Sequence, residues 1–354
     1  MTVTTISPSF QFRDRTQSDP EQKIVTRLIQ ATAEVGVQID PISVVNLYVA
    51  LKSKPLAILT GVAQSGKVAL VRILAQALIG DDPFRCQIMT GHAWWAGQTG
   101  NVALFTDMQT RLNSDKVLNL IEVAGRPDNA HRVYLACLTR ISPAELTGFF
   151  SELAYQLQHG QIMQLPSIHL TEPIAYPPNL LLIGTMDTVR LECRDVDLLT
   201  KTTIIQWSAV ESKLSAARPT TVTPLDHDGE FLSSCIRDEW SARLKLLRIL
   251  GKRAPSLRPV LQIADLLKMS DAALPDSVIG EAVVYLANAW SKQGVGLFDP
   301  AITRNIAIAA DLAIAQTVLP YVGQTLRARP ALHDPLKQVL KPFPYSLTIL
   351  ENLN

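Results

Sequence analysis

The hydrophobic positions along residues 1–207 follow two alternating spacings, which predict strands and helices in succession. Short strand-like runs, most of them continuously apolar as in strands buried on both faces, occupy residues 56–59, 85–91, 133–138, 168–171 and 180–186. Helical spacing of apolar residues separates these runs, at residues 21–36, 39–54, 68–79, 106–125 and 143–159. Strands that alternate with helices in this way predict an α/β fold, a parallel sheet covered by helices on both faces.

The pattern changes after residue 207. The stretch from Ser215 to Gly229 is rich in Pro, Thr and Asp, and beyond it the apolar runs have helical spacing, at residues 231–251, 257–269, 276–293 and 303–322. We therefore expect a loose arm over residues 1–20, an α/β domain over 21–207, a linker over 208–230 and an all-helical domain over 231–354.

Composition restricts the class of protein. The 33 Lys and Arg residues balance the 32 Asp and Glu residues to a net charge of +1, so no global field attracts nucleic acid. The cysteines form no CxxC pair and the histidines show no metal spacing, so we assign no metal ligand. We find no apolar run of transmembrane length and no apolar signal core at the N-terminus. We therefore expect a cytoplasmic protein that does not contact a membrane.

The chain is organised around residues 54–78, where an apolar strand leads through a Gly-bounded loop into a helix. Gly61, Gly66 and Lys67 match the GxxxxGK pattern of a phosphate loop, whose backbone N–H groups and lysine bind phosphates. A lysine in the first helical turn is unfavourable unless an anion lies beside it, which supports this interpretation. The predicted nucleotide-binding residues are Gly61, Val62, Ala63, Gln64, Ser65, Gly66, Lys67 and Val68.

One position of this loop departs from the pattern. The residue after the lysine is normally Ser or Thr, whose hydroxyl holds magnesium, and here it is Val68. A branched aliphatic side chain cannot ligate a hard cation that requires oxygen. The loop therefore keeps the groups that bind the phosphates of ATP or GTP and lacks the group that holds magnesium.

From about residue 39 to residue 350 the chain resembles the AAA+ module of the McrB-like NTPases, the GTP- or ATP-driven subunits of modified-DNA restriction systems. LLLIGTMDT (180–188) resembles the family's sensor strand, and IEVAGRPDNAHRVYLACLTRIS (121–142) has the spacing of the segment that ends in its Asp-Glu motif. FFSELAYQLQHG (149–160) is similar to the helix that follows that motif, and DLAIAQTVLPYVG (311–323) resembles the lid. The resemblance implies an AAA+ P-loop sheet, a helical lid and assembly into homo- or hetero-oligomers.

The resemblance fails at the residues that the family uses for hydrolysis. Thr139 and Arg140 align with the Asp-Glu pair, Asp187 with the polar sensor, and Lys201 is the cation left where the family has a trans-acting arginine finger. A hydroxyl holds magnesium weakly and an arginine cannot act as a general base. Loss of such a finger alone costs about three to five decades of rate. We therefore expect a pseudo-NTPase that acts through nucleotide binding or assembly, in a defence or DNA-processing complex, rather than an enzyme.

Several alternatives stay open. An active motor with unorthodox ligands would need a carboxylate such as Glu145 or Glu122, and a nucleotide-free scaffold would need none. Arg140 either adds a second cation to the phosphate site or pairs with Asp187 while the site stays empty. The basic stretch from Arg237 to Arg258 either contacts nucleic-acid phosphates or forms a solvated face or subunit interface; its cations are Arg237, Arg243, Lys245, Arg248, Lys252, Arg253 and Arg258.

Overall fold

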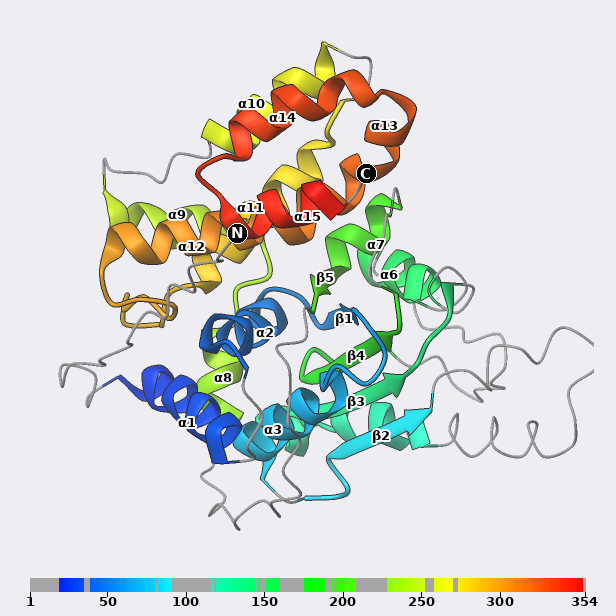
Figure 1. The fold of residues 1–354 in the computed structure, drawn as a ribbon. Helices are drawn as coiled ribbons and strands as arrows, with labels where there is room; N and C mark the ends of the chain where they lie inside the picture. The colour runs from blue at the N-terminus through cyan, green and yellow to red at the C-terminus, as the bar shows by residue number, and fades with distance from the viewer. Residues whose placement is uncertain are drawn as a thin grey trace, which may run out of the picture.

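A five-stranded, all-parallel sheet forms the centre of the protein, flanked on one side by a group of helices from the second half of the chain (Figure 1). The structure, a computed structural model, describes residues 19–34, 39–80, 82–90, 116–117, 119–143, 146, 150–159, 175–188, 193, 195–207, 228–251, 258–269 and 273–352. The strands are β1 Leu56–Thr60, β2 Cys86–Thr90, β3 Tyr134–Thr139, β4 Leu180–Met186 and β5 Thr202–Gln206, in the order β2-β3-β4-β1-β5. The predicted α/β fold is thus confirmed.

Four of these strands lie where the apolar runs predicted them, and β5 does not appear among the predictions. Its sequence, TTIIQ, is short and half polar, yet its first four residues are buried. It pairs with β1, from Leu56 opposite Thr202 to Thr60 opposite Gln206. The strand predicted at residues 168–171 lies outside the described residues.

Alternate side chains of each strand enter two separate cores, because successive residues of a strand point to opposite faces of the sheet. Ala57 and Leu59 of β1 pack with helices α1 (Pro20–Glu34), α2 (Pro41–Ser53) and α3 (Lys67–Ile79). Leu56 and Ile58 pack on the other face with α6 (Ser151–Gln158) and α7 (Val196–Lys201). The helices therefore cover both faces, as the pattern predicted.

Local signals in the sequence set the ends of the helices that frame the predicted phosphate loop. The carboxylate of Asp40 accepts a hydrogen bond from the N–H of Ile42 at 3.1 Å, and Pro41 occupies the first turn of α2. Helix α3 begins after Gly66, which has a left-handed φ of 85°, and ends at Gly80 with φ 77°. The loop is thus held between β1 and a helix with defined ends.

The second half of the chain is helical, as predicted. Its helices are α8 Asp228–Ser234, α9 Glu239–Leu250, α10 Arg258–Lys268, α11 Asp276–Asn288, α12 Ile302–Ala313, η5 Ile314–Val318, α13 Leu319–Ala328, α14 His333–Leu340 and α15 Pro344–Asn352, with a short turn η6 Pro330–Leu332. Another short turn, η3 Pro127–Asn129, precedes β3 in the α/β part. Several boundaries differ from the prediction. The helix predicted over residues 276–293 ends at Asn288, and the helical run predicted over 303–322 continues to Ala328. Residues 228–230, assigned to the linker, begin α8, and the helix predicted over 231–251 is interrupted, because Asp238 caps a new helix by accepting from the N–H of Ser241 at 2.8 Å. Residues 1–18 of the predicted arm and 208–227 of the linker lie outside the described residues.

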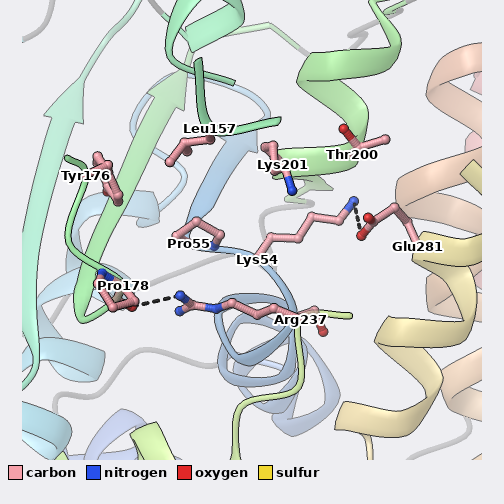
Figure 2. Close-up of a pocket in the computed structure, with 10 residues that line it drawn as sticks. Lys54, Pro55, Leu157, Tyr176, Pro178, Thr200, Lys201, Arg237 and Glu281 are labelled. Atoms are coloured by element: carbon pink, nitrogen blue, oxygen red, sulfur yellow. Dashed lines mark hydrogen bonds and ion pairs between the residues drawn. The ribbon is translucent and has the colours of Figure 1, made fainter. Parts of the chain in front are cut away.

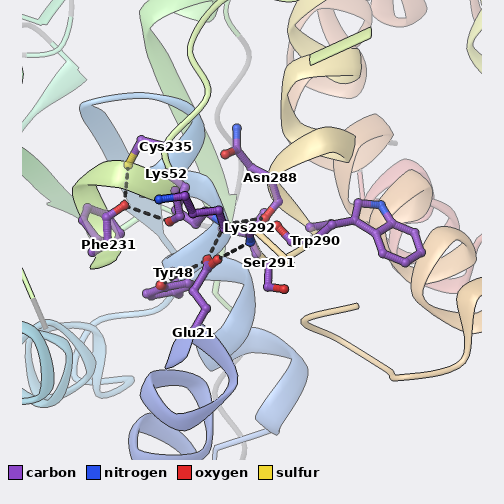
Figure 3. Close-up of polar contacts among 12 residues, drawn as sticks. Glu21, Tyr48, Lys52, Phe231, Cys235, Asn288, Trp290, Ser291 and Lys292 are labelled. Atoms are coloured by element: carbon purple, nitrogen blue, oxygen red, sulfur yellow. Dashed lines mark hydrogen bonds and ion pairs between the residues drawn. The ribbon is translucent and has the colours of Figure 1, made fainter. Parts of the chain in front are cut away.

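The helical part shares a core with the α/β part. Apolar side chains of α9, α11 and α12 belong to the same buried cluster as those of α1, α2 and α3. A buried ion pair reinforces this contact: Lys52 of α2 pairs with Glu21 of α1, and its Nζ donates to the carbonyls of Asn288 at 3.2 Å and Trp290 at 3.3 Å (Figure 3). Glu21 also accepts from the N–H of Lys292 at 3.0 Å. Removal of one partner of such a pair typically costs about 3–5 kcal/mol, so loss of Lys52 or Glu21 should weaken the contact between the two parts.

One helical run, Ile302–Ala328, is long and apolar enough to cross a membrane by length and composition, so the expectation that no run reaches this length is wrong. Most of its apolar window, 72%, is buried within the protein. Burial of this extent is typical of a core helix in a globular domain, where neighbouring helices cover the apolar surface on all sides.

Candidate phosphate-loop site

The carboxyl ends of neighbouring strands bring the predicted site residues to one edge of the sheet. Gly61 follows β1, Arg140 follows β3, Asp187 follows β4 and Trp207 follows β5. Because the strand order is β3-β4-β1-β5, these ends are adjacent. Ligands of open parallel sheets bind at this edge, in the crevice outside the carboxyl ends of the strands.

The loop itself has a backbone conformation that its glycines permit. Gly61 has φ 149°, and a Cβ built on it would lie 2.2 Å from the carbonyl oxygen of Trp207, so no larger residue fits. Gln64 also has a left-handed φ, of 59°. The side chains of Val62, Ala63 and Gln64 are exposed, whereas Ser65 and Lys67 are buried. The loop therefore projects from the sheet while its lysine points inward.

Trp207 braces the loop from the neighbouring strand, a role that the sequence did not indicate. Its backbone N–H donates to the carbonyl of Thr60 at 2.7 Å, and its indole Nε1–H donates to the carbonyl of Ser65 at 2.7 Å. The two bonds tie both ends of the loop to the end of β5. No local motif surrounds Trp207, so only knowledge that β5 lies beside β1 could have identified it.

Oxygen atoms of the protein surround the ammonium group of Lys67 and use its hydrogen-bonding capacity. Its Nζ donates to the carbonyls of Val62 at 2.7 Å and Gly61 at 3.0 Å, contacts Ser65 Oγ at 3.3 Å, and forms an ion pair with Asp187 Oδ1 at 3.1 Å. The Lys67 side chain is 4% exposed and that of Asp187 is 36% exposed. A lysine in the first turn of a helix is unfavourable unless an anion lies beside it, and here the carboxylate of Asp187 is that anion.

One of the two arrangements expected for Arg140 was an ion pair with Asp187, and the Lys67–Asp187 pair shows that this expectation is wrong. Asp187 pairs with Lys67 instead, and Arg140 is exposed and makes no side-chain ion pair within the described residues. The backbone of Arg140 is held in the left-handed region, φ 58°, and its N–H donates to Thr185 Oγ1 at 3.0 Å. The guanidinium therefore stands at the edge that carries the loop without a fixed partner there.

The positions expected to lack catalytic groups lie at the same edge. Thr139 is the last residue of β3 and is half-buried, and Val68 is half-buried in the first turn of α3. Among the described residues no three His, Cys, Asp or Glu side chains come together as a metal site. Glu145, the carboxylate that an active motor would need, lies outside these residues, and Glu122 is exposed.

Lys201, aligned with the finger, does not join this edge. It ends α7 and directly precedes β5, so it lies at the amino edge of the sheet, opposite the loop. There it lines a cavity together with Lys54 and Glu281 (Figure 2). The structure thus separates Lys201 from the other predicted site residues of its own chain.

The basic stretch does not form a continuous basic surface over its described residues. Arg237 points inward and donates to the carbonyl of Pro178 at 2.7 Å, and Arg243 pairs with Glu239. Lys245 donates to the carbonyl of Trp290 at 2.7 Å, and burial, with a smaller contribution from Lys52, lowers its pKa to about 7. Arg248 and Arg258 are exposed, and Lys252 and Arg253 lie outside the described residues.

Exposed apolar side chains accompany these cations on α9. Trp240, Leu244 and Leu247 follow helical spacing, and Trp240 and Leu247 are 71% and 56% exposed. An apolar stripe of this kind on a helix surface is typical of a protein–protein contact rather than of a nucleic-acid interface.

The four cysteines behave as core residues. None forms a disulfide, and Cys137 is fully buried in β3. Burial raises the pKa of Cys86 and of Cys193 to about 11, so these thiols stay protonated and unreactive near neutral pH.

The chain matches no protein-family model, and no curated protein is significantly similar to it in sequence. What the site does must therefore follow from its own residues and their geometry.

Proposed function

We propose that this chain is a catalytically degenerate subunit of the McrB-like AAA+ type, which keeps a phosphate loop, hydrolyses neither ATP nor GTP, and works by assembly with further subunits. One observation carries the proposal: the ammonium of Lys67 is bound by its own loop and by Asp187, at an edge that also holds Thr139 and Arg140. A working NTPase needs that ammonium for the outer phosphates and needs carboxylates for magnesium and water.

The chemistry of the site supports the absence of turnover. Val68 offers no oxygen to a cation, and a cation at Arg140 cannot remove a proton from water. The carboxylate that is present, Asp187, faces Lys67 at 3.1 Å, where it repels an incoming γ-phosphate instead of activating a nucleophile. Each change removes a different group that phosphoryl transfer requires. The effects of such changes on the rate are not additive, but the rate can fall to background without additivity.

Two forms of the proposal differ in whether nucleotide binds. In the binding form a triphosphate displaces Asp187 from Lys67, and the exposed guanidinium of Arg140 turns to the phosphates in place of a divalent ion. In the second form the Lys67–Asp187 pair closes the loop permanently, and the protein is a nucleotide-free scaffold. The saturated ammonium favours this second candidate, and a nucleotide titration separates the two.

The exposed stripe of Trp240, Leu244 and Leu247 on α9 supports action by assembly. Isolated apolar residues are common on protein surfaces, but aligned large ones mark contact sites. We assign this face to a second copy of the chain. Its flanking Glu239–Arg243 ion pair offers both charges to the same face of a partner.

The test is steady-state phosphate release by purified protein with ATP or GTP and magnesium, over a range of protein concentrations. We expect no release above background. Release that disappears in Lys67→Ala but persists in Lys337→Ala, an exposed lysine of α14, would overturn the proposal. The double change Thr139→Asp with Arg140→Glu should not restore hydrolysis, because Val68 and the missing finger remain.

A further inference from the structure

A cavity of about 180 Å³ lies at the amino edge of the sheet, where β1 begins, on the side opposite the phosphate loop (Figure 2). One part of its wall is apolar and consists of Pro55, Leu157, Tyr176 and Pro178. Another part carries the charges of Lys54, Lys201 and Glu281. An apolar cavity of about 150 Å³ can bind benzene, so this space suits a ligand of similar size that is apolar at one end and charged at the other.

Lys201 supplies an accessible cation to this cavity. Figure 2 shows its amino end pointing from the end of α7 towards the Lys54–Glu281 pair. Within the described residues its ammonium has no hydrogen bond or ion pair, and the nitrogen is not a buried atom, so solvent reaches it. An ammonium carries three donors and no acceptor, so this group is available to a carboxylate in the cavity.

Glu281 of α11 supplies an accessible anion to the same cavity. Its Oε2 lies 3.5 Å from Lys54 Nζ, whereas its Oε1 accepts no hydrogen bond from the described part of the chain. The Glu281 side chain is 17% exposed and Oε1 is not a buried atom, so a ligand can reach this oxygen. Burial raises the pKa of Glu281, and Lys54 and Lys201 act in the opposite direction, so both cations lie within electrostatic range of the carboxylate.

These two groups call for a ligand that carries both charges. No ion pair joins Lys201 to Glu281 directly, although both are described and line one cavity. A ligand ammonium beside Glu281 and a ligand carboxylate beside Lys201 would extend the Lys54–Glu281 pair into a row of charges that alternate in sign. A simple anion would leave Glu281 Oε1 without a donor, and a simple amine would leave Lys201 without an acceptor. Arg237 takes no part, because its Nη1 donates to the carbonyl of Pro178 at 2.7 Å and its Nε and Nη2 are buried.

We propose that this cavity binds a free α-amino acid with a short apolar side chain. The carboxylate of the amino acid pairs with Lys201, its ammonium donates to Oε1 of Glu281, and its side chain packs against Leu157 and Tyr176. Lys201 ends α7 in the α/β part and Glu281 belongs to α11 in the helical part, so the ligand joins the two parts of the chain. Binding should therefore raise the melting temperature. This inference does not depend on the function proposed above.

Calorimetric titration with L-leucine and with L-valine, at pH 7 and constant ionic strength, tests the site. We expect one amino acid per chain, with affinity at least tenfold weaker in Lys201→Met and in Glu281→Gln. Lys201→Met removes the charge and keeps an unbranched side chain, and it should leave the melting temperature of the unliganded protein unchanged, because the ammonium has no partner among the described residues. Lys268→Met is the matched control, since Lys268 lies in the last turn of α10 as Lys201 does in α7, and it should bind as the unchanged protein does.

Analogues of leucine test each half of the charge arrangement. Isocaproate lacks the ammonium and isoamylamine lacks the carboxylate, so each should bind at least tenfold more weakly than L-leucine. The inference would be overturned if neither amino acid bound to the unchanged protein at concentrations up to about 10 mM. Undiminished binding by Lys201→Met, or isocaproate binding as tightly as L-leucine, would equally overturn it. Tighter binding of L-aspartate or L-lysine than of L-leucine would contradict the role of the apolar wall.

Discussion

Replacing Asp187 by asparagine should open the phosphate loop to nucleotide. The carboxylate lies 3.1 Å from Lys67 Nζ and occupies the space beside the ammonium that a phosphate would need. The substitution removes one negative charge and keeps the size of the side chain. Because Asp187 is 36% exposed, losing the ion pair should cost the fold no more than about 1 kcal/mol.

The gain in binding can be estimated from the repulsion that disappears. Two like charges about 5 Å apart repel by about 3 kcal/mol at an effective dielectric constant of about 20 and by under 1 kcal/mol in water. A partly exposed carboxylate lies between these limits, so about 1–2 kcal/mol is expected. Asp187→Asn should therefore bind ATP or GTP about 5- to 30-fold more tightly than the unchanged protein.

The assay is calorimetric titration with ATP and with GTP, each with magnesium and with EDTA. EDTA should change the affinity little, because Val68 and Thr139 do not hold the ion. Asp334→Asn, which removes the same charge from a side chain that is 97% exposed on α14, is the matched control and should change nothing. Equal or weaker binding by Asp187→Asn would refute the idea that this carboxylate competes with phosphate. Tight binding that requires magnesium would refute the degenerate site altogether, and no binding by either protein would establish the nucleotide-free scaffold.

Three further predictions follow from other contacts. In the nucleotide-binding form of the proposal, Arg140→Ala should weaken binding by about 1.5–3 kcal/mol. In either form it should leave the melting temperature unchanged, because Arg140 is exposed and Asp187 is paired elsewhere; a lower melting temperature would contradict this. Trp240→Ser with Leu247→Ser should shift a sedimenting oligomer towards monomer, and an unchanged sedimentation coefficient would remove α9 from the interface. Burial lowers the pKa of Lys245 to about 7, below its value of about 10.4 in the unfolded chain. The charged lysine therefore destabilises the folded state by its full amount below pH 7, and this destabilisation decreases as the pH rises towards about 10.4. Lys245→Met should therefore raise the free energy of unfolding by about 1–3 kcal/mol at pH 6, after loss of the bond to Trp290, and by less at pH 10, as measured by denaturant titration.

The sequence alone determined the features that depend on neighbouring residues. Strands β1, β3 and β4 were predictable because a strand buried on both faces must be apolar throughout, and the loop was predictable because Gly61 and Gly66 meet local backbone requirements next to Lys67. The loss of a metal ligand at Val68 is likewise a property of one position. Helices in the second half followed from their apolar period, although the cap at Asp238 that divides the first of them was not recognised.

Which of these residues lie in contact depends on the tertiary structure. Strand β5 is short and rich in threonine, and its place beside β1 depends on the order of the strands rather than on its own pattern. That order brings Trp207 to the loop and directs Asp187 to Lys67 instead of Arg140, across 142 and 120 positions of sequence respectively.

The same limit applies at the opposite edge of the sheet. Lys201 and Arg237, assigned from the sequence to a finger position and to a basic surface, line one cavity because α7 ends where the segment before α9 returns to the sheet. The pattern of apolar and polar residues along the sequence indicates on which face of its helix or strand a residue lies. Which residue it contacts from another element depends on chain topology and packing. Charged side chains can form ion pairs only after that topology has brought them together.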